Sequence, residues 1–216
     1  MKLLGWLVSF GLITTAGRVI TFDTAPLGQT PPGWTIAMTN RGEPPVWQIM
    51  RDHTAATQPY VFAQLSKDTS AGRYPLAILD NPKMHDGDLS VRLKPVSGRD
   101  DRDGGLVWRY RDPNNYYLVR ADALAGNVAV YKVENGRFLS IQPNGIHGRH
   151  FVKHTIPTNG WSILKVSVRG NRFQVYVNHR RILRAQDDTF TGAGRVGLWT
   201  AGDSVTYFDD FRVNPK

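Results

Sequence analysis

The chain has 216 residues, 41% of them hydrophobic and 21% charged, and it contains no cysteine. This length suits one globular domain, and the lack of cysteine excludes both disulfides and a lipid anchor on an N-terminal cysteine. Lys and Arg total 27 against 18 Asp and Glu, and this excess favours anionic partners. The basic residues are scattered without a run of five, so we expect no binding to nucleic acid.

Residues 1–16 have the pattern of a secretory signal peptide. Lys2 precedes an apolar run that extends to Ile13, and small residues follow up to Ala16. The run is shorter than the ~20 residues that a transmembrane helix needs, and no other segment is long and apolar enough to cross a bilayer. We therefore expect cleavage near Ala16, export to the periplasm or the medium, and one mature domain over residues 17–216.

Short runs of alternating apolar and polar residues dominate the mature chain, and helical periodicity is nearly absent. Loops rich in Gly, Pro, Asn and Asp separate these runs, as in an all-β sandwich. In the first half, strands are expected at residues 19–23, 34–39, 46–51, 60–65, 76–80 and 89–95.

The second half of the chain alternates more strictly. In the run 105–111, the pattern places Tyr110 with the apolar residues of one face and Arg109 and Arg111 on the other. A turn at residues 112–115 then predicts a hairpin. Strands are expected at residues 105–111, 116–121, 127–133, 137–141, 161–169, 172–178, 181–185, 194–200 and 205–213. So many strands exceed an immunoglobulin sandwich and suit a jelly roll of two large sheets.

Six segments between residues 86 and 211 carry a family resemblance. They are residues 86–91, 104–110, 115–121, 161–168, 194–200 and 203–211. Together they resemble exported bacterial domains of the concanavalin A-like lectin/glucanase superfamily, and within it they are similar to domains of the 3-keto-disaccharide hydrolase type. The resemblance implies an all-β, two-sheet concanavalin A-like jelly-roll sandwich that interacts with carbohydrate.

The hairpin of residues 108–121 is the predicted ligand-binding site. It combines planar donors, which bind hydroxyls or carboxylates, with aromatic rings that cover the apolar side of a sugar. A lysine on the next strand is expected to extend the same surface. The predicted ligand-binding residues are Arg109, Arg111, Asn115, Tyr116, Tyr117, Arg120 and Lys132. The alternative is a solvated outer face on which Arg side chains lie over their neighbours.

Asp209 and Asp210 place two adjacent carboxylates in the closing strand, which is unfavourable unless they are exposed or neutralised. The family resemblance implies a structural Ca²⁺ between Asp210 and Asp23, because Ca²⁺ prefers carboxylate and carbonyl oxygens. The alternative is a β-bulge at a sheet edge with one Asp paired to an Arg. No phosphate loop or dinucleotide fingerprint is present, so no organic cofactor is expected.

The chain contains only two glutamates, Glu43 and Glu134, and both lie beside turn residues. A retaining glucanase needs two carboxyl groups ~5 Å apart, so we expect no paired-Glu glucanase. Three functions stay open. The first is an exported module that binds a glycan on its concave sheet. The second, implied by the resemblance, is a hydrolase or lyase for 3-keto-glycosides, with Arg109 or Arg120 stabilising an oxyanion and the base unidentified. The third is a structural or adhesion domain of the cell envelope.

Overall fold

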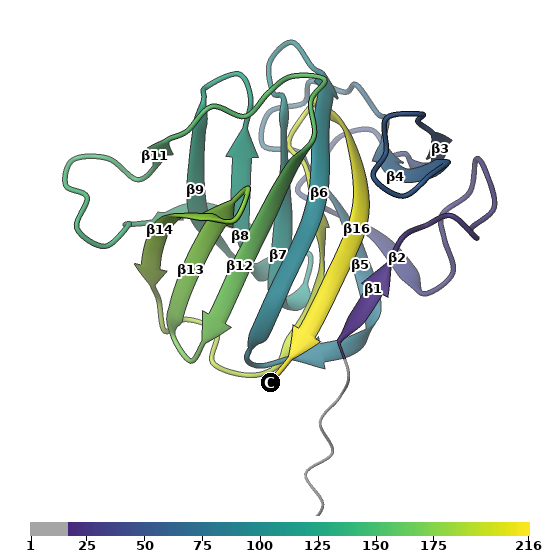
Figure 1. Cartoon of the computed structure of the whole chain (residues 1–216). Coiled ribbons are helices and arrows are strands. Elements are labelled where there is room, and N and C mark those ends of the chain that lie inside the picture. The colour runs from purple at the N-terminus through teal and green to yellow at the C-terminus, as the bar shows by residue number, and fades with distance from the viewer. Residues whose placement is uncertain (1–16) are drawn as a thin grey trace, which may run out of the picture.

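The computed structural model describes residues 17–216, which form two antiparallel β-sheets packed face to face (Figure 1). The all-β, two-sheet sandwich predicted from the alternation is confirmed. Within the described residues there is no helix long and apolar enough to cross a membrane. The predicted signal peptide, residues 1–16, lies outside the described residues.

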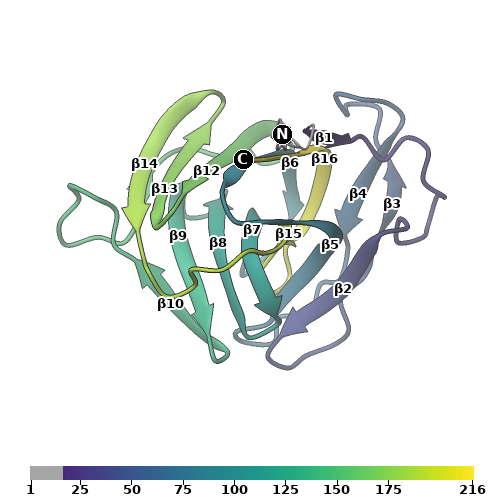
Figure 2. The ribbon, with the colours of Figure 1, turned by 90° about the horizontal axis from the view of Figure 1, so that it is seen from below.

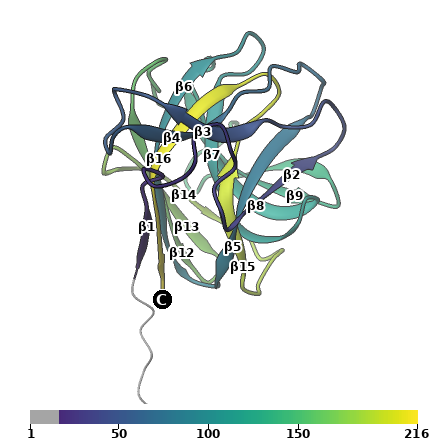
Figure 3. The ribbon, with the colours of Figure 1, turned by 90° about the vertical axis from the view of Figure 1, so that its right-hand side faces the viewer.

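Sheet A has the strand order β14-β13-β12-β6-β16-β4-β3, and β1 also pairs with β16. Its strands are β1 (Arg18–Ile20), β3 (Trp47–Arg51), β4 (Tyr60–Gln64), β6 (Gly87–Ser97), β12 (Ser162–Arg169), β13 (Arg172–Val177), β14 (Arg180–Gln186) and β16 (Val205–Pro215). Figure 3 shows β1 beside β16, so the two ends of the described chain lie next to each other.

Sheet B has the order β10-β9-β8-β7-β15-β5-β2, and β11 also pairs with β9. Its strands are β2 (Trp34–Thr39), β5 (Tyr74–Met84), β7 (Asp103–Asp112), β8 (Asn115–Asp122), β9 (Asn127–Glu134), β10 (Arg137–Ile141), β11 (Val152–Lys153) and β15 (Gly194–Trp199). Every strand range expected from the sequence overlaps one of these strands. The two-residue β11 is not predicted, because a segment this short shows no alternation.

The larger hydrophobic core fills the space between the two sheets. Alternate residues of β12 and β13, such as Val166 and Val175, are buried there, and Trp108 and Tyr117 reach into the same core from sheet B. Full burial of one such side chain contributes ~1.5–3 kcal/mol. This energy determines which face of each strand points inward, because a slip of one residue would expose the whole apolar set.

A β-bulge at Arg109 interrupts the alternation of β7. The register between β7 and β8 shifts after Trp108, and Arg109 has a φ of 49°. The shift moves Tyr110 to the outer face of sheet B, whereas the sequence places it on the same face as Trp108. Gly194 on β15 lies against the bulge, where a Cβ atom would clash with the backbone of Arg109. A bulge re-aims the side chains beyond it, which simple alternation does not show.

Sheet B curves toward its outer face. In the strand order, β10 and β5 are five steps apart, which is about 24 Å in a flat sheet. The rings of Phe138 on β10 and Tyr74 on β5 nevertheless stack with their centroids 4.6 Å apart. Two side chains cannot meet across a flat sheet of that width, so the outer face of sheet B is concave. Figure 2 shows the two layers, with β10 and β2 at the edges of sheet B.

A second apolar cluster lines this concave face. Its buried members are Leu76, Ile78, Val107, Tyr110, Tyr116, Leu118, Val133, Trp199 and Ala201. Three partly buried aromatic residues, Tyr74, Tyr131 and Phe138, pack against it from above. Sheet B is therefore apolar on both faces, whereas the outer face of sheet A carries polar and charged side chains.

Candidate functional site

The predicted hairpin forms as β7 and β8, but Arg109 is buried and bonded to other parts of the chain. Its side chain is 2% exposed, and it donates hydrogen bonds to the carbonyl oxygens of Phe190 (2.6 Å), Gly170 (2.7 Å) and His85 (3.2 Å). Burial lowers the pKa of Arg109. Its donors hold three loops together, which leaves it enclosed by protein groups.

The two tyrosines of β8 point to opposite faces of sheet B, and both are buried. Tyr116 faces the concave side and shares a hydrogen bond of 2.8 Å with the hydroxyl of Thr39. Tyr117 faces the core, donates to the carboxylate of Asp187 (2.7 Å) and accepts from the backbone N–H of Phe190 (2.9 Å). Burial raises the pKa of both hydroxyls.

The other predicted residues of the hairpin region have different partners. The guanidinium of Arg111 is exposed and lies 4.9 Å from the ring centroid of Phe190. Asn115 donates to the carboxylate of Asp112 and stabilises the hairpin turn. Lys132 lies at the side of the sandwich, where it contacts Thr189 and Asp187. The loop of residues 187–190 therefore brings together four of the seven predicted residues, which are Arg109, Arg111, Tyr117 and Lys132. Asn115 lies in the hairpin turn, and Tyr116 and Arg120 face the concave side.

Arg120 is the predicted residue that lies on the concave face among charged and aromatic neighbours. Its Nη2 atom is 2.9 Å from Oδ2 of Asp122, and its guanidinium lies over the ring of Tyr131 at 5.5 Å. Its side chain is 20% exposed, and its Nε has no hydrogen-bond partner among the described residues. Burial alone would lower the pKa of Arg120, but the negative charges of Asp103 and its neighbours outweigh burial and raise it.

Asp103 is the buried counter-charge of this group. It is fully buried and pairs with Asp122 across β7 and β8, next to the pair formed by Gly105 and Arg120. Its Oδ1 accepts from the backbone N–H of Ala201 (2.9 Å) and the hydroxyl of Ser204 (3.0 Å), whereas Oδ2 has no partner among the described residues. Burial raises the pKa of Asp103 to about 7. Its protonation therefore changes near neutral pH, directly behind Arg120.

An aromatic stack lies beside Arg120. The ring of Phe138 stacks between Tyr131, at 4.4 Å between centroids, and Tyr74, at 4.6 Å. Trp199 continues the stack 5.5 Å from Tyr74. The first three rings are partly exposed, and because neighbouring rings cover their faces, they offer ring edges next to a guanidinium. We call Arg120, Asp101, Tyr74, Tyr131 and Phe138 the Arg120 site.

Asp101 is the partly exposed carboxyl of the Arg120 site. Its backbone N–H donates to Asp203 (2.9 Å), which fixes the loop before β7. Burial raises the pKa of Asp101, and the nearby charge of Arg120 opposes this effect. The site therefore combines hydrogen-bond donors, an acceptor and aromatic surface within one concave face.

The sequence shows only part of the Arg120 site. Alternation on β8 indicates that Arg120 and Asp122 share a face with Leu118, because they follow it at intervals of two residues. It does not show that β10 and β5 bring Phe138 and Tyr74 together. That contact depends on the curvature of the whole sheet, which no local pattern encodes.

The two aspartates of the predicted calcium site already have protein partners. Asp210 lies in a bulge of β16 with a φ of 52°, 3.1 Å from Arg92 and 3.4 Å from Arg212. Asp23 accepts a hydrogen bond from the backbone N–H of Tyr60. Among residues 17–216, no three His, Cys, Asp or Glu side chains are grouped as metal ligands. The bulge with a paired Asp, our alternative, is present, but it lies on β16, an inner strand of sheet A, and not at a sheet edge. Calcium stays a prediction.

Comparison with known proteins gives one sequence relative and several similar structures. No protein-family model matches the chain. Over 114 residues, 51% of the chain, the sequence is 32% identical to a levanase of Bacillus subtilis, of which the match covers 15%. The chain thus corresponds to a small part of that enzyme.

Two solved structures resemble the whole sandwich. The carbohydrate-binding module CBM66 of Bacillus subtilis has a TM-score of 0.64 and 21% identity, over 88% of this chain and 99% of the module. Domain 4 of AbnA, a GH43 arabinanase of Geobacillus stearothermophilus solved with arabinotriose, has a TM-score of 0.56 and 18% identity, over 92% and 93%. These likenesses show the fold, which is a two-sheet β-sandwich of the kind found in carbohydrate-binding modules and consistent with the concanavalin A-like type.

Proposed function

We propose that this chain is an exported carbohydrate-binding domain and that a neutral glycan binds at the Arg120 site on the concave face of sheet B. The observation that carries the proposal is the partly exposed aromatic stack of Tyr131, Phe138 and Tyr74 beside the guanidinium of Arg120, whose side chain is 20% exposed. Concave sites that join apolar surface to a few oriented polar groups are typical of ligand binding.

The chemistry of the site matches a sugar. Aromatic surface desolvates the C–H groups of a sugar ring, while Arg120 donates to its hydroxyls and Asp101 accepts from them. The carboxylate of Asp122, 2.9 Å from Nη2 of Arg120, holds the guanidinium in place. An Arg held in this way loses little side-chain entropy when a ligand binds.

The comparisons support a carbohydrate as the ligand. One similar structure is a carbohydrate-binding module, another was solved with arabinotriose, and the sequence relative is a levanase. Levan and arabinan are therefore the first polymers to test. The similarity to a domain of an extracellular arabinanase also supports export, in agreement with the predicted signal peptide.

Affinity electrophoresis of the mature domain through gels that contain levan, arabinan or other neutral polysaccharides tests the proposal. Tyr131→Ala should weaken retention by about tenfold, which is about 1.4 kcal/mol, because it removes aromatic contact and the ring beneath Arg120. Tyr207→Ala is the matched control, since it removes a partly exposed tyrosine from the outer face of sheet A. Unchanged retention of a folded Tyr131→Ala protein would exclude this site.

The same geometry supports a second candidate, an enzyme that acts on 3-keto-glycosides. A ketone acidifies the neighbouring proton, so elimination needs a base and a donor for the enolate oxygen. Asp101 is partly exposed with a raised pKa, which suits a base, and Arg120 suits the donor. Mass spectrometry of a 3-keto-glucoside mixed with the domain tests this. Product formation that Asp101→Asn abolishes would establish the enzyme, and absence of product with any keto sugar would exclude it.

A further inference from the structure

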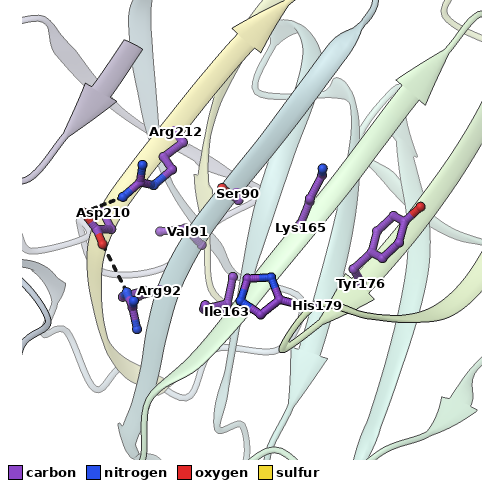
Figure 4. A pocket seen from close by; sticks show the side chains of 9 residues that line it. All are labelled: Ser90, Val91, Arg92, Ile163, Lys165, Tyr176, His179, Asp210 and Arg212. Atoms are coloured by element: carbon purple, nitrogen blue, oxygen red, sulfur yellow. Dashed lines mark hydrogen bonds and ion pairs between the residues drawn. The ribbon is translucent and has the colours of Figure 1, made fainter. Parts of the chain in front are cut away.

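A separate groove lies on the outer face of sheet A, on the side of the sandwich opposite the Arg120 site. Its volume is about 520 Å³, within the range of small-ligand sites. Figure 4 shows its lining, which comes from β6, β12, β13, β16 and the turn after β13. The lining residues are Ser90, Val91, Arg92, Ile163, Lys165, Tyr176, His179, Asp210 and Arg212. We call it the sheet A groove.

The bulge of β16 shapes one wall of the sheet A groove. The register between β16 and β6 shifts between Asp209 and Arg212, and Asp210 has a positive φ at this point. Asp210 is 7% exposed and pairs with Arg92 and Arg212 on either side of it (Figure 4). The carboxylate therefore fixes two guanidinium groups at the wall of the groove.

Both guanidinium groups keep donors for a ligand. Within the described residues, Arg92 bonds to Asp210 through Nε, and Arg212 contacts it through Nη2. Each guanidinium has five N–H donors, so most of them face the groove or solvent. The side chains of Arg92 and Arg212 are 37% and 46% exposed, which makes these donors accessible.

Lys165 adds a third cation on the opposite side of the groove. Its ammonium group lies 5.6 Å from the ring centroid of Tyr176 and 3.2 Å from Asp88, and its side chain is 39% exposed. The three cationic side chains of the lining thus stand against two carboxylates, Asp210 beside the arginines and Asp88 beside Lys165. This excess favours an anionic ligand.

The groove also has apolar surface, which an inorganic anion would not use. Ile163 and the ring of Tyr176 are partly exposed in its lining. Apolar and aromatic surface between planar donors suits a sugar ring that carries a negative group. Guanidinium groups bind carboxylates in a bidentate manner, and Arg92 and Arg212 each contact Asp210 through one nitrogen, so across residues 17–216 their other donors stay free for a ligand carboxylate.

Further basic residues extend the positive charge along the same face. Across β13 and β14, Tyr176 pairs with Arg181 and Gln174 pairs with Arg184, so both arginines lie beside the groove on the outer face. Both are exposed. A row of cations next to a groove suits a polymer with repeated negative charges rather than a single small anion.

We propose that the sheet A groove is a second binding site and that its ligand is a carboxylate-bearing sugar unit of an acidic polysaccharide. One uronate unit lies in the groove with its carboxylate on Arg212 and Arg92 and its ring against Tyr176, and neighbouring units follow the exposed arginines of β14. This site is independent of the neutral glycan bound at the Arg120 site.

Isothermal titration of the mature domain with polygalacturonate tests this inference. Arg212→Gln and Lys165→Gln should each weaken binding about tenfold, since a hydrogen bond to a charged group contributes about 1.5 kcal/mol or more. Arg172→Gln is the matched control, because it removes the same charge from an exposed residue of the same face that lies neither in the groove lining nor on β14. It should change binding less than about twofold. Equal weakening by all three variants would show attraction to diffuse charge alone and would overturn the site.

Folding of the variants is checked by thermal unfolding. Arg212→Gln leaves Asp210 paired with Arg92, and Lys165→Gln leaves Asp88 bonded to Arg169 at 2.8 Å, so no buried carboxylate loses its last partner. If one variant does not fold, the other still decides the outcome.

The chemical class of the ligand is decided by two further polymers. Dextran sulfate carries sulfate in place of carboxylate, and duplex DNA carries phosphate. Groove-dependent binding of polygalacturonate supports the proposal, while groove-dependent binding of dextran sulfate or DNA without polygalacturonate contradicts it. An Arg120→Gln variant should bind polygalacturonate as the parent does, which separates this site from the Arg120 site.

Discussion

The outer faces of the two sheets differ in composition and shape. Sheet B curls until aromatic rings from distant strands meet, and its concave face becomes a second apolar core with a buried ionisable group, Asp103. Sheet A alternates regularly, with apolar residues inward and exposed charges outward. One face can therefore bind through desolvation and contact with aromatic surface, and the other through charge.

This difference also explains why arginines on different faces of the sandwich have different roles. Arg109 is enclosed by the carbonyl groups that it bonds, Arg120 is held at a concave wall by buried carboxylates, and Arg212 extends from an open face with free donors. The environment that the sheets create, more than the residue type, decides whether an Arg stabilises the fold or meets a ligand.

The largest expected effect is a loss of stability when the concave core is opened. Trp199→Ala removes a fully buried indole and should lower the free energy of unfolding by about 3–5 kcal/mol. Tyr176→Ala, on the outer face of sheet A, should change it by less than about 1 kcal/mol. Urea unfolding of both variants measures the difference. Similar small losses for the two would mean that the concave face is not a core.

The next effect is a pH dependence that originates from the concave face. The pKa of Asp103 is raised from 3.8 to about 7 by burial, so between pH 4 and pH 7 the folded state holds a proton that the unfolded state has lost. Stability then falls as pH rises through this window, by about 4 kcal/mol at most. Asp103→Asn should abolish its part of this fall and increase stability above pH 7.

Urea unfolding at several pH values between 4 and 8 tests the role of Asp103. The raised pKa values of Asp101 and Asp209 act in the same direction, so the parent protein alone does not isolate Asp103. The difference between Asp103→Asn and the parent does isolate it. A difference that stays constant across this pH range would show that Asp103 is ionised throughout.

The two proposed binding sites should respond differently to added salt. Retention of an acidic polysaccharide by the sheet A groove should weaken about tenfold between low salt and 0.5 M NaCl, because exposed charges are screened. Binding of a neutral glycan at the Arg120 site should change little, because it depends on aromatic contact and on partly buried hydrogen bonds. Titrations at both salt concentrations measure the two responses, and equal responses would remove the distinction between the faces.

The sequence predicts the sandwich well because alternation reports one local fact, which is the face on which each side chain lies. It therefore locates β12 and β13 almost to the residue. It misplaces Tyr110 because the Arg109 bulge, which adds one residue to β7 relative to β15, reverses the parity of the residues that follow. That bulge depends on Gly194, which is 85 positions later in the chain and has no local signal.

The candidate sites are less predictable because they depend on distant contacts. The predicted set of seven residues follows the hairpin, yet only Arg120 lies in the Arg120 site, whose aromatic residues come from β5, β9 and β10. The sheet A groove needs β6, β12, β13 and β16 side by side, and β6 and β16 are far apart in sequence. Pairings of this range depend on the topology of the whole sandwich.

The smallest expected effect has the opposite sign to that of Asp103 and comes from sheet A. Burial alone would raise the pKa of Asp88, but hydrogen bonds from Ser167, Arg169 and Lys165 outweigh burial and lower it. Its stabilisation is therefore present above pH 4 and is lost as pH falls through its folded pKa. Asp88→Asn should lower the free energy of unfolding by about 1 kcal/mol at pH 7 and by nothing near pH 2. Urea unfolding at these two pH values measures this. If Asp88→Asn instead increased stability at pH 7, the outer face of sheet A would hold its carboxylate under strain, as the concave face does with Asp103, and the contrast between the two faces would not hold.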